Sequence, residues 1–113
     1  NIAPHEMDVW SHKQLKNVVS HTEIEIKKLK NFLESFQFED AIRLTQGYEK
    51  KIYSWWSYRA KDWKKSNRGR RLDHIWVSQQ MSKHLEKTFI EENVRGWERP
   101  SDHVPVVADF KFS

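Results

Sequence analysis

An aspartate and a histidine, Asp102 and His103, stand side by side within residues 99–106, whose sequence is RPSDHVPV. A carboxylate can bind a divalent cation or orient an imidazole, and an imidazole changes its charge near neutral pH. The pair therefore indicates proton transfer or metal-assisted chemistry. Such a pair is also common where the aspartate caps a turn and the histidine is an ordinary surface residue, so the rest of the chain has to decide between the two interpretations.

The residues after this pair predict a strand. Apolar side chains alternate with other residues from Val104 to Phe112, which is the period of a strand with one apolar face. Pro105 lacks a backbone N–H, and proline is tolerated near the beginning of a strand. We therefore expect Asp102 and His103 on a loop at a sheet edge, a place where functional side chains are often found.

A further carboxylate lies in another predicted strand. Residues 72–77 (LDHIWV) are apolar on both faces apart from Asp73 and His74, which predicts a central strand covered on both sides. A buried carboxylate is costly unless it is paired or hydrogen-bonded. An imidazole is a natural partner for Asp73, and the carboxylate would also orient that ring.

The remaining elements would form the scaffold. Thr22 and Glu25 match a capping box, and apolar residues follow at helical spacing, so we predict a helix over residues 22–36 with its apolar stripe packed on a sheet. We also predict two adjacent strands within residues 38–44 and 52–58. A helical turn over residues 79–85 and a short strand over residues 87–90 complete the prediction.

The composition is that of one small domain. The chain has 113 residues, of which 37% are hydrophobic and 32% charged, so the core must be small. The absence of cysteine excludes disulfides and thiolate metal sites, and it is compatible with a reducing cytosol. No apolar run is long enough to span a membrane. We therefore predict a soluble, cytoplasmic protein with no membrane partner.

Basic residues are concentrated between Arg59 and Arg71. This stretch holds seven lysines and arginines and one acid, whereas the formal charge of the whole chain is +4. Trp63 interrupts the stretch and further aromatic residues precede it, a combination that suits contacts to phosphates and stacking on bases or sugars. Nucleic acid is the predicted partner; a long, solvated basic loop is the alternative.

Four short blocks occur in order along the chain: NIAP (residues 1–4), WWSYR (55–59), NRGRRLD (67–73) and PSDHVPV (100–106). Together they resemble the exodeoxyribonuclease III family of DNA-repair nucleases, within the endonuclease/exonuclease/phosphatase superfamily. The resemblance implies an α/β fold, a four-layered α/β sandwich built from two similar halves. Residues 1–113 would be the C-terminal half, with a mixed β-sheet and one main helix packed on it, and the N-terminal half would be absent.

The resemblance also implies roles for individual residues. His103 would contact the scissile phosphate as a base or charge stabiliser, and Asp73 would orient it. Asp102 would lie at a Mg²⁺ (or Mn²⁺) site, and Asn1 would place the phosphate or the attacking water. Asn1 resembles the end of a Gly-Asp-x-Asn motif whose aspartate is absent here, together with an upstream metal-binding glutamate.

DNA-binding residues follow from the same resemblance and from the basic stretch. Trp55 and Leu72 match positions that line the pocket for an extruded abasic sugar, and Arg70 stands where some relatives carry an aromatic residue. The further candidates for DNA contacts are Tyr58, Arg59, Lys64, Lys65, Asn67 and Arg68.

The implied function is that of a fragment of a Mg²⁺-dependent DNA-repair nuclease, a 3′–5′ exodeoxyribonuclease and abasic-site endonuclease that hydrolyses phosphodiester bonds. Its partners would be DNA, either abasic or with a duplex 3′ end, and the missing N-terminal half. Alone, the fragment is expected to be inactive and to self-associate. Two alternatives remain: a noncatalytic basic module that binds nucleic acid, and a phosphatase-like relative that acts on phospholipid or inositol phosphate.

Overall fold

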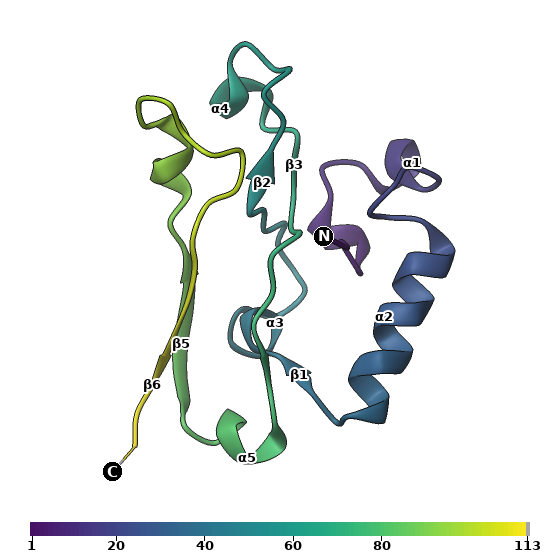
Figure 1. The fold of residues 1–113 in the computed structure, drawn as a ribbon, viewed down its shortest axis with the longest axis vertical. Coiled ribbons are helices and arrows are strands. Elements are labelled where there is room, and N and C mark those ends of the chain that lie inside the picture. Colours follow the sequence, from purple (N-terminus) through teal and green to yellow (C-terminus); the bar gives the residue numbers. More distant parts are fainter. Residues whose placement is uncertain (113) are drawn as a thin grey trace.

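Three separate two-stranded antiparallel sheets form the β-structure of this computed structural model, which describes residues 1–112 (Figure 1). The pairs are β1 (Glu39–Asp40) with β4 (Trp76–Val77), β2 (Trp55–Trp56) with β3 (Gly69–Arg70), and β5 (Leu85–Ile90) with β6 (Val106–Phe110). The predicted α/β class is confirmed. The mixed sheet that the resemblance implies is divided here into three antiparallel pieces.

The longest helix, α2 (Glu23–Ser35), begins and ends for identifiable reasons. The hydroxyl of Thr22 accepts a hydrogen bond from the backbone N–H of Glu25, and Thr22 N–H donates to the Glu25 carboxylate, so the predicted capping box is confirmed. At the other end, the N–H groups of Phe38 and Gln37 donate to the carbonyls of Leu33 and Glu34, which is the Schellman pattern. Gln37 takes the left-handed position with a φ of 55°.

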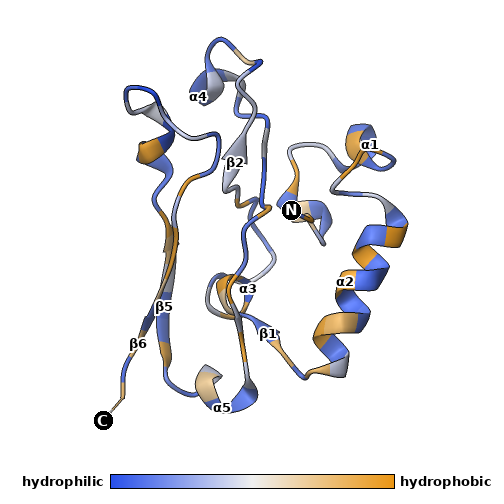
Figure 2. Cartoon of the chain, viewed as in Figure 1, coloured by the Kyte–Doolittle hydropathy of each residue, from blue (hydrophilic) through white to orange (hydrophobic). Residues whose placement is uncertain are grey.

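The apolar stripe of α2 is buried only in part. Leu29 is buried, but Phe32 and Phe36 are 42% and 61% exposed, so the prediction that the whole stripe belongs to the core is wrong. In Figure 1, α2 lies at one side of the molecule. The ring of Phe32 contacts Trp76 of β4 at 5.6 Å between ring centroids, and its other ring neighbours are Phe36 and Phe38, just beyond the end of the same helix. Hydrophobic and hydrophilic residues alternate along this helix in Figure 2.

The described residues also form six shorter helices: η1 (Glu6–Asp8), α1 (His12–Leu15), α3 (Ala41–Gln46), α4 (Trp63–Ser66), α5 (Gln79–Ser82) and η2 (Glu92–Gly96). Of these, α5 agrees with the predicted helical turn, and β5 contains the strand predicted over residues 87–90. None of the helices in the described part of the chain combines the length and the hydropathy of a membrane span.

The strand predicted within residues 38–44 is wrong beyond Asp40. The Asp40 carboxylate accepts a hydrogen bond from Arg43 N–H and caps α3. Ala41 and Ile42 are fully buried on this helix, so the apolar run is covered as a helical turn and not as part of a strand beside residues 52–58.

The central strand predicted over residues 72–77 is also wrong, because only Trp76 and Val77 pair with another strand. The preceding N–H groups bind elsewhere. Those of Leu72 and Asp73 both donate to the hydroxyl of Ser54, at 3.0 and 3.1 Å, and that of Arg71 donates to the Asp8 carbonyl at 2.7 Å. This segment is therefore anchored by single hydrogen bonds to neighbouring segments.

The final strand is shorter than the predicted residues 104–112. Val104 N–H donates to the Ser54 carbonyl at 2.8 Å, and Pro105 has no N–H, so β6 starts at Val106. Proline thus lies directly before the strand, as expected. Asp102 and His103 lie on the loop that leads into it.

An ionic cluster is buried beside the small apolar core formed by Ala3, Val9, Leu15 and Leu72. Asp8 is fully buried and accepts hydrogen bonds from Arg43 at 2.6 Å and from Arg71 at 2.7 Å.

Arg71 reaches beyond Asp8 to a second carboxylate. Its guanidinium also donates to Asp40 at 2.6 Å. Its place in the basic stretch predicts an exposed position, but the side chain is fully buried. Although burial alone lowers the pKa of Arg71, the hydrogen bonds and charge of Asp8 and Asp40 raise it above its usual value.

Candidate active site

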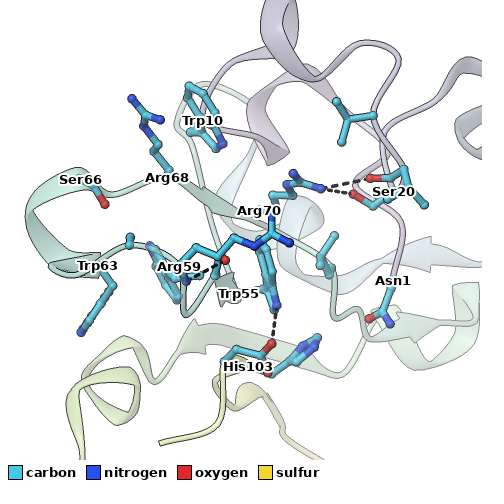
Figure 3. A pocket seen from close by; sticks show the side chains of 17 residues that line it. Asn1, Trp10, Ser20, Trp55, Arg59, Trp63, Ser66, Arg68, Arg70 and His103 are labelled. Carbon is cyan, nitrogen blue, oxygen red and sulfur yellow. Dashed lines mark hydrogen bonds between the residues drawn. The ribbon is translucent and has the colours of Figure 1, made fainter.

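A pocket of about 900 Å³ opens where the N-terminal residue, residues 18–20, β2, β3 and the loop before β6 meet (Figure 3). The structure brings together here eight of the predicted site residues: Asn1, Trp55, Arg59, Arg68, Arg70, Leu72, Asp102 and His103. Segments far apart in the sequence therefore contribute to one cavity.

A hydrogen-bonded chain of three side chains holds the histidine at this pocket. His103 Nδ1 lies 2.8 Å from Asp73 Oδ2, and the Ser54 hydroxyl donates to the same carboxylate oxygen at 2.7 Å. A carboxylate only accepts, so Nδ1 of the neutral ring carries the hydrogen and Nε2 is left for a substrate. Ser54 is fully buried, whereas the side chains of His103 and Asp73 are 35% and 37% exposed.

Ser54 is not among the predicted site residues. It accepts hydrogen bonds from two backbone N–H groups while its own hydroxyl donates to Asp73, so it fixes both the carboxylate and the segment that carries it. A signal for it is present in the sequence: Ile52, Ser54 and Trp56 alternate onto one buried face. A serine on such a face needs a polar partner.

Asp102 is held through both its side chain and its backbone. Trp55 Nε1 donates to Asp102 Oδ2 at 3.0 Å, and Trp56 N–H donates to the Asp102 carbonyl at 3.0 Å. Asp102 Oδ1 makes no hydrogen bond within residues 1–112, and Asn1 lines the same pocket. Carboxylate and amide oxygens are the hard ligands that Mg²⁺ prefers.

Both residues carry oxygen atoms of the kind that would suit Mg²⁺, but two side chains do not complete such a site. No group of three or more His, Cys, Asp or Glu side chains in the described part of the chain could hold a metal ion. Asp102 and Asn1 would therefore supply only some of the ligands that a Mg²⁺ ion takes.

Two arginine–tryptophan pairs also line the pocket. The guanidinium of Arg68 lies 4.8 Å from the ring centre of Trp10, and that of Arg70 lies 5.3 Å from the ring centre of Trp55. Both distances suit cation–π contacts. Trp10 is not among the predicted site residues, and a lone tryptophan in the N-terminal loop offers no pattern that could indicate it.

Comparison with known proteins decides the family. Residues 1–103 match the Endonuclease/Exonuclease/phosphatase family. The chain belongs to this family. Over 79 residues it is 38% identical to exodeoxyribonuclease III of Haemophilus influenzae, a match that covers 70% of this chain and 29% of that protein. Over 106 residues it is 34% identical to the exodeoxyribonuclease of Bacillus subtilis, covering 94% of this chain and 40% of that protein.

Solved structures of the family show the same fold. An AP endonuclease from Archaeoglobus fulgidus superposes with a TM-score of 0.92 at 32% identity, covering 98% of this chain and 42% of the other. The 3′ phosphatase NExo from Neisseria, bound to a product DNA hairpin, gives 0.92 at 31% identity, covering 99% and 42%. The predicted exodeoxyribonuclease III family is confirmed. The chain spans less than half the length of each of these relatives.

Four of the residues predicted to bind DNA do not line this pocket. The Tyr58 hydroxyl donates to the Pro100 carbonyl at 2.7 Å, so Tyr58 supports the loop that carries Asp102. Asn67 ends α4 in the left-handed conformation, and its side-chain oxygen accepts from Trp56 Nε1 at 3.1 Å. Lys64 and Lys65 are exposed on α4. A DNA contact remains a prediction for all four.

Proposed function

We propose that this chain forms part of a Mg²⁺-dependent DNA-repair nuclease, acting as a 3′–5′ exodeoxyribonuclease and abasic-site endonuclease. The observation that carries the proposal is the Ser54–Asp73–His103 chain, which places a free imidazole nitrogen at a pocket lined by arginines and tryptophans. The names of the relatives, an exodeoxyribonuclease III and an AP endonuclease, support the same chemistry.

Each group has a task in phosphodiester hydrolysis. Asp73 fixes the ring of His103, and Nε2 faces the scissile phosphate as base or charge stabiliser. Arg59 and Arg68 attract the DNA backbone, since phosphate contacts dominate the affinity of such proteins. Asn1 orients the phosphate or the attacking water, and Asp102 helps to hold Mg²⁺. When bound, the ion would stabilise the negative charge that develops on the phosphate oxygens.

Further metal ligands are proposed to come from residues beyond these 113. The described side chains offer Asp102 and Asn1 but no cluster of three ligands, and the relatives are more than twice as long as the part matched here. The chain alone is therefore proposed to be inactive and, with apolar surface uncovered, to self-associate.

A chimera tests this function. In the exodeoxyribonuclease of Bacillus subtilis, the 106-residue segment that aligns with this chain is replaced by the chain itself. With Mg²⁺ we expect the chimera to shorten 3′ ends and to nick an abasic duplex, and His103→Ala to abolish both. Lys28→Gln on the exposed surface of α2 is the control and should retain full activity.

Three results would count against the proposal. A folded chimera that binds DNA without cleaving it would identify a binding module. Release of phosphate from an inositol phosphate, without cleavage of DNA, would support the phosphatase-like alternative. Turnover by the 113-residue chain alone, abolished by His103→Ala, would show that its own residues complete the site.

A further inference from the structure

Arg70 crosses the pocket from one wall to the other. Its side chain starts on β3, and Nη1 donates to the Val19 carbonyl at 3.1 Å and to the Ser20 hydroxyl at 3.0 Å. Figure 3 shows this side chain directed at Ser20. Its guanidinium also lies over the ring of Trp55 at 5.3 Å. Arg70 therefore occupies space between the indole and the Val18–Ser20 segment that a larger ligand would need.

The positive charge of Arg70 has no acidic partner among the described residues. Arg43 and Arg71, the arginines of the buried cluster, form ion pairs with Asp8, whereas the ion pairs of residues 1–112 do not include Arg70. Its Nε is buried and makes no hydrogen bond there. Burial lowers the pKa of Arg70, and no neighbouring carboxylate offsets this effect.

This cation lies next to the proposed reaction centre. Trp55 connects the two, because its N–H donates to Asp102 while its face lies under Arg70. The acid that lines the pocket, Asp102, is already engaged by that indole, and Arg59 and Arg68 add further positive charge. A neutral sugar placed here would leave Arg70 partly desolvated and unpaired, whereas a small anion would pair with it.

We propose that Arg70 is a specificity-determining residue that makes this site prefer a DNA 3′ end carrying a small anionic group, a phosphate or a carboxylate, over an extruded abasic sugar. The inference rests on the proposed function, because it assigns the substrate class within the same pocket. It differs from the abasic pocket that the resemblance alone implies, since the guanidinium narrows that pocket and supplies charge to it.

Equilibrium binding tests this preference without a metal ion. Fluorescence anisotropy with the chimera in EDTA compares four labelled hairpins: a 3′-hydroxyl end, a 3′-phosphate end, a 3′-phosphoglycolate end, and an internal tetrahydrofuran as the abasic analogue. We expect the two anionic ends to bind about tenfold more tightly than the 3′-hydroxyl end, the effect of one charge-assisted hydrogen bond. The phosphate and phosphoglycolate arms distinguish which anion fits.

The variants isolate the guanidinium. Arg70→Gln should remove the preference for anionic ends and improve relative binding of the abasic analogue, and Arg70→Lys should keep part of the preference because it keeps the charge. Lys28→Gln, on the exposed face of α2, changes the total charge equally and should leave the preference intact. Circular dichroism checks that each variant is folded.

The outcomes separate the inference from the function beneath it. If the chimera binds none of the four hairpins, the proposed function itself is contradicted. If the chimera binds all four with equal affinity, or if Arg70→Gln keeps the full preference in the folded chimera, only the role of Arg70 is overturned.

Discussion

The free nitrogen of His103 is useful only if the ring is held in one orientation, and three side chains provide this. The Asp73 carboxylate accepts a hydrogen bond from Nδ1 of His103 at 2.8 Å, and the Ser54 hydroxyl donates to the same carboxylate at 2.7 Å. The two exposed members are thereby tied to a fully buried one. A histidine that acts through such a chain should depend on each member.

Mutation of the pair tests this dependence. In the chimera, His103→Ala and Asp73→Asn should each lower kcat by orders of magnitude, because the first removes the reacting group and the second removes its orientation. The double variant should be little worse than the poorer single variant. Strictly additive losses in single-turnover assays would mean that Asp73 acts independently of His103.

Ser54 should matter for folding as well as for catalysis. Ser54→Ala leaves the N–H groups of Leu72 and Asp73 without their acceptor, and each buried, unsatisfied group costs about 1–3 kcal/mol. We expect the free energy of unfolding, measured in urea, to fall by about 2 kcal/mol or more. Ser35→Ala, on the exposed end of α2, is the matched control; a loss no larger than that of the control would contradict this account.

For helices and strands, the sequence predicts features that depend on neighbouring residues, but not which distant segments form hydrogen bonds with one another. The capping box of α2 involves residues three apart, so the sequence alone predicts its start. Residues 72–77 have the composition of a buried strand. The N–H groups of Leu72 and Asp73, however, donate to the Ser54 hydroxyl, and the preceding N–H, that of Arg71, donates to the Asp8 carbonyl. Both acceptors are far away in the sequence.

The same limit explains which site residues the sequence does not predict. The PSDHVPV block predicts Asp102 and His103 because its residues are contiguous. Trp10 and the segment 18–20 enter the site only through the fold. For Ser54, the alternating pattern indicates a buried hydroxyl that needs a partner, but only the fold shows that the partner is Asp73. The burial of Arg71 is also hidden, since its partners Asp8 and Asp40 are distant in sequence.

The end of α2 offers a stability prediction. Gln37 has a φ of 55° and is exposed, so its Cβ is strained without a compensating contact. Gln37→Gly should raise the free energy of unfolding by about 0.5–1 kcal/mol, after allowing for the greater entropy of glycine in the unfolded chain. Gln37→Ala keeps a Cβ and should give no such gain. If urea titrations showed the same change in the free energy of unfolding for both substitutions, the strain at the Gln37 Cβ would be refuted.

For the molecule as a whole, the basic stretch divides into parts with different tasks. Arg71 is buried in the ionic cluster, Arg68 and Arg70 line the pocket, and Lys64 and Lys65 are exposed on α4. Only the exposed and pocket-lining members can reach phosphates. Long-range attraction of DNA should therefore depend on the stretch without Arg71.

Salt dependence measures how many phosphates these side chains bind. Neutralising Lys64, Lys65 and Arg68 to glutamine should weaken binding to any duplex and reduce the slope of log K against log salt by about 1 for each phosphate that the variant no longer binds. Neutralising three lysines of α2 (Lys27, Lys28 and Lys30) changes the net charge by the same amount. This control variant should keep most of the slope of log K against log salt. If both triple variants lowered the slope alike, net charge and not this surface would govern binding.

Acid should weaken the fold through the buried cluster, in two ranges of pH. His74 accepts from Arg71 at Nδ1 and donates to the Ile2 carbonyl at Nε2, so the folded protein needs the neutral ring; burial, followed by the charge of Arg71, lowers the pKa of His74 below 6.5. For Asp8, burial raises the pKa but Arg71 and Arg43 outweigh it, and the pKa lies below 3.8.

Both shifts have the same sign for stability, because in each case the unfolded chain binds the proton more readily than the folded one. The contribution of His74 to the free energy of unfolding should be complete above about pH 6.5 and should decline as the pH falls below that value. The contribution of Asp8 should decline only below about pH 4. Urea unfolding from pH 8 to pH 3 should show both declines. His74→Gln should flatten the first and Asp8→Asn the second, and His84→Gln, at an exposed histidine outside the cluster, should change neither. If His74→Gln leaves the decline between pH 6.5 and pH 5 unchanged, this histidine is not what couples the N-terminal segment to Arg71.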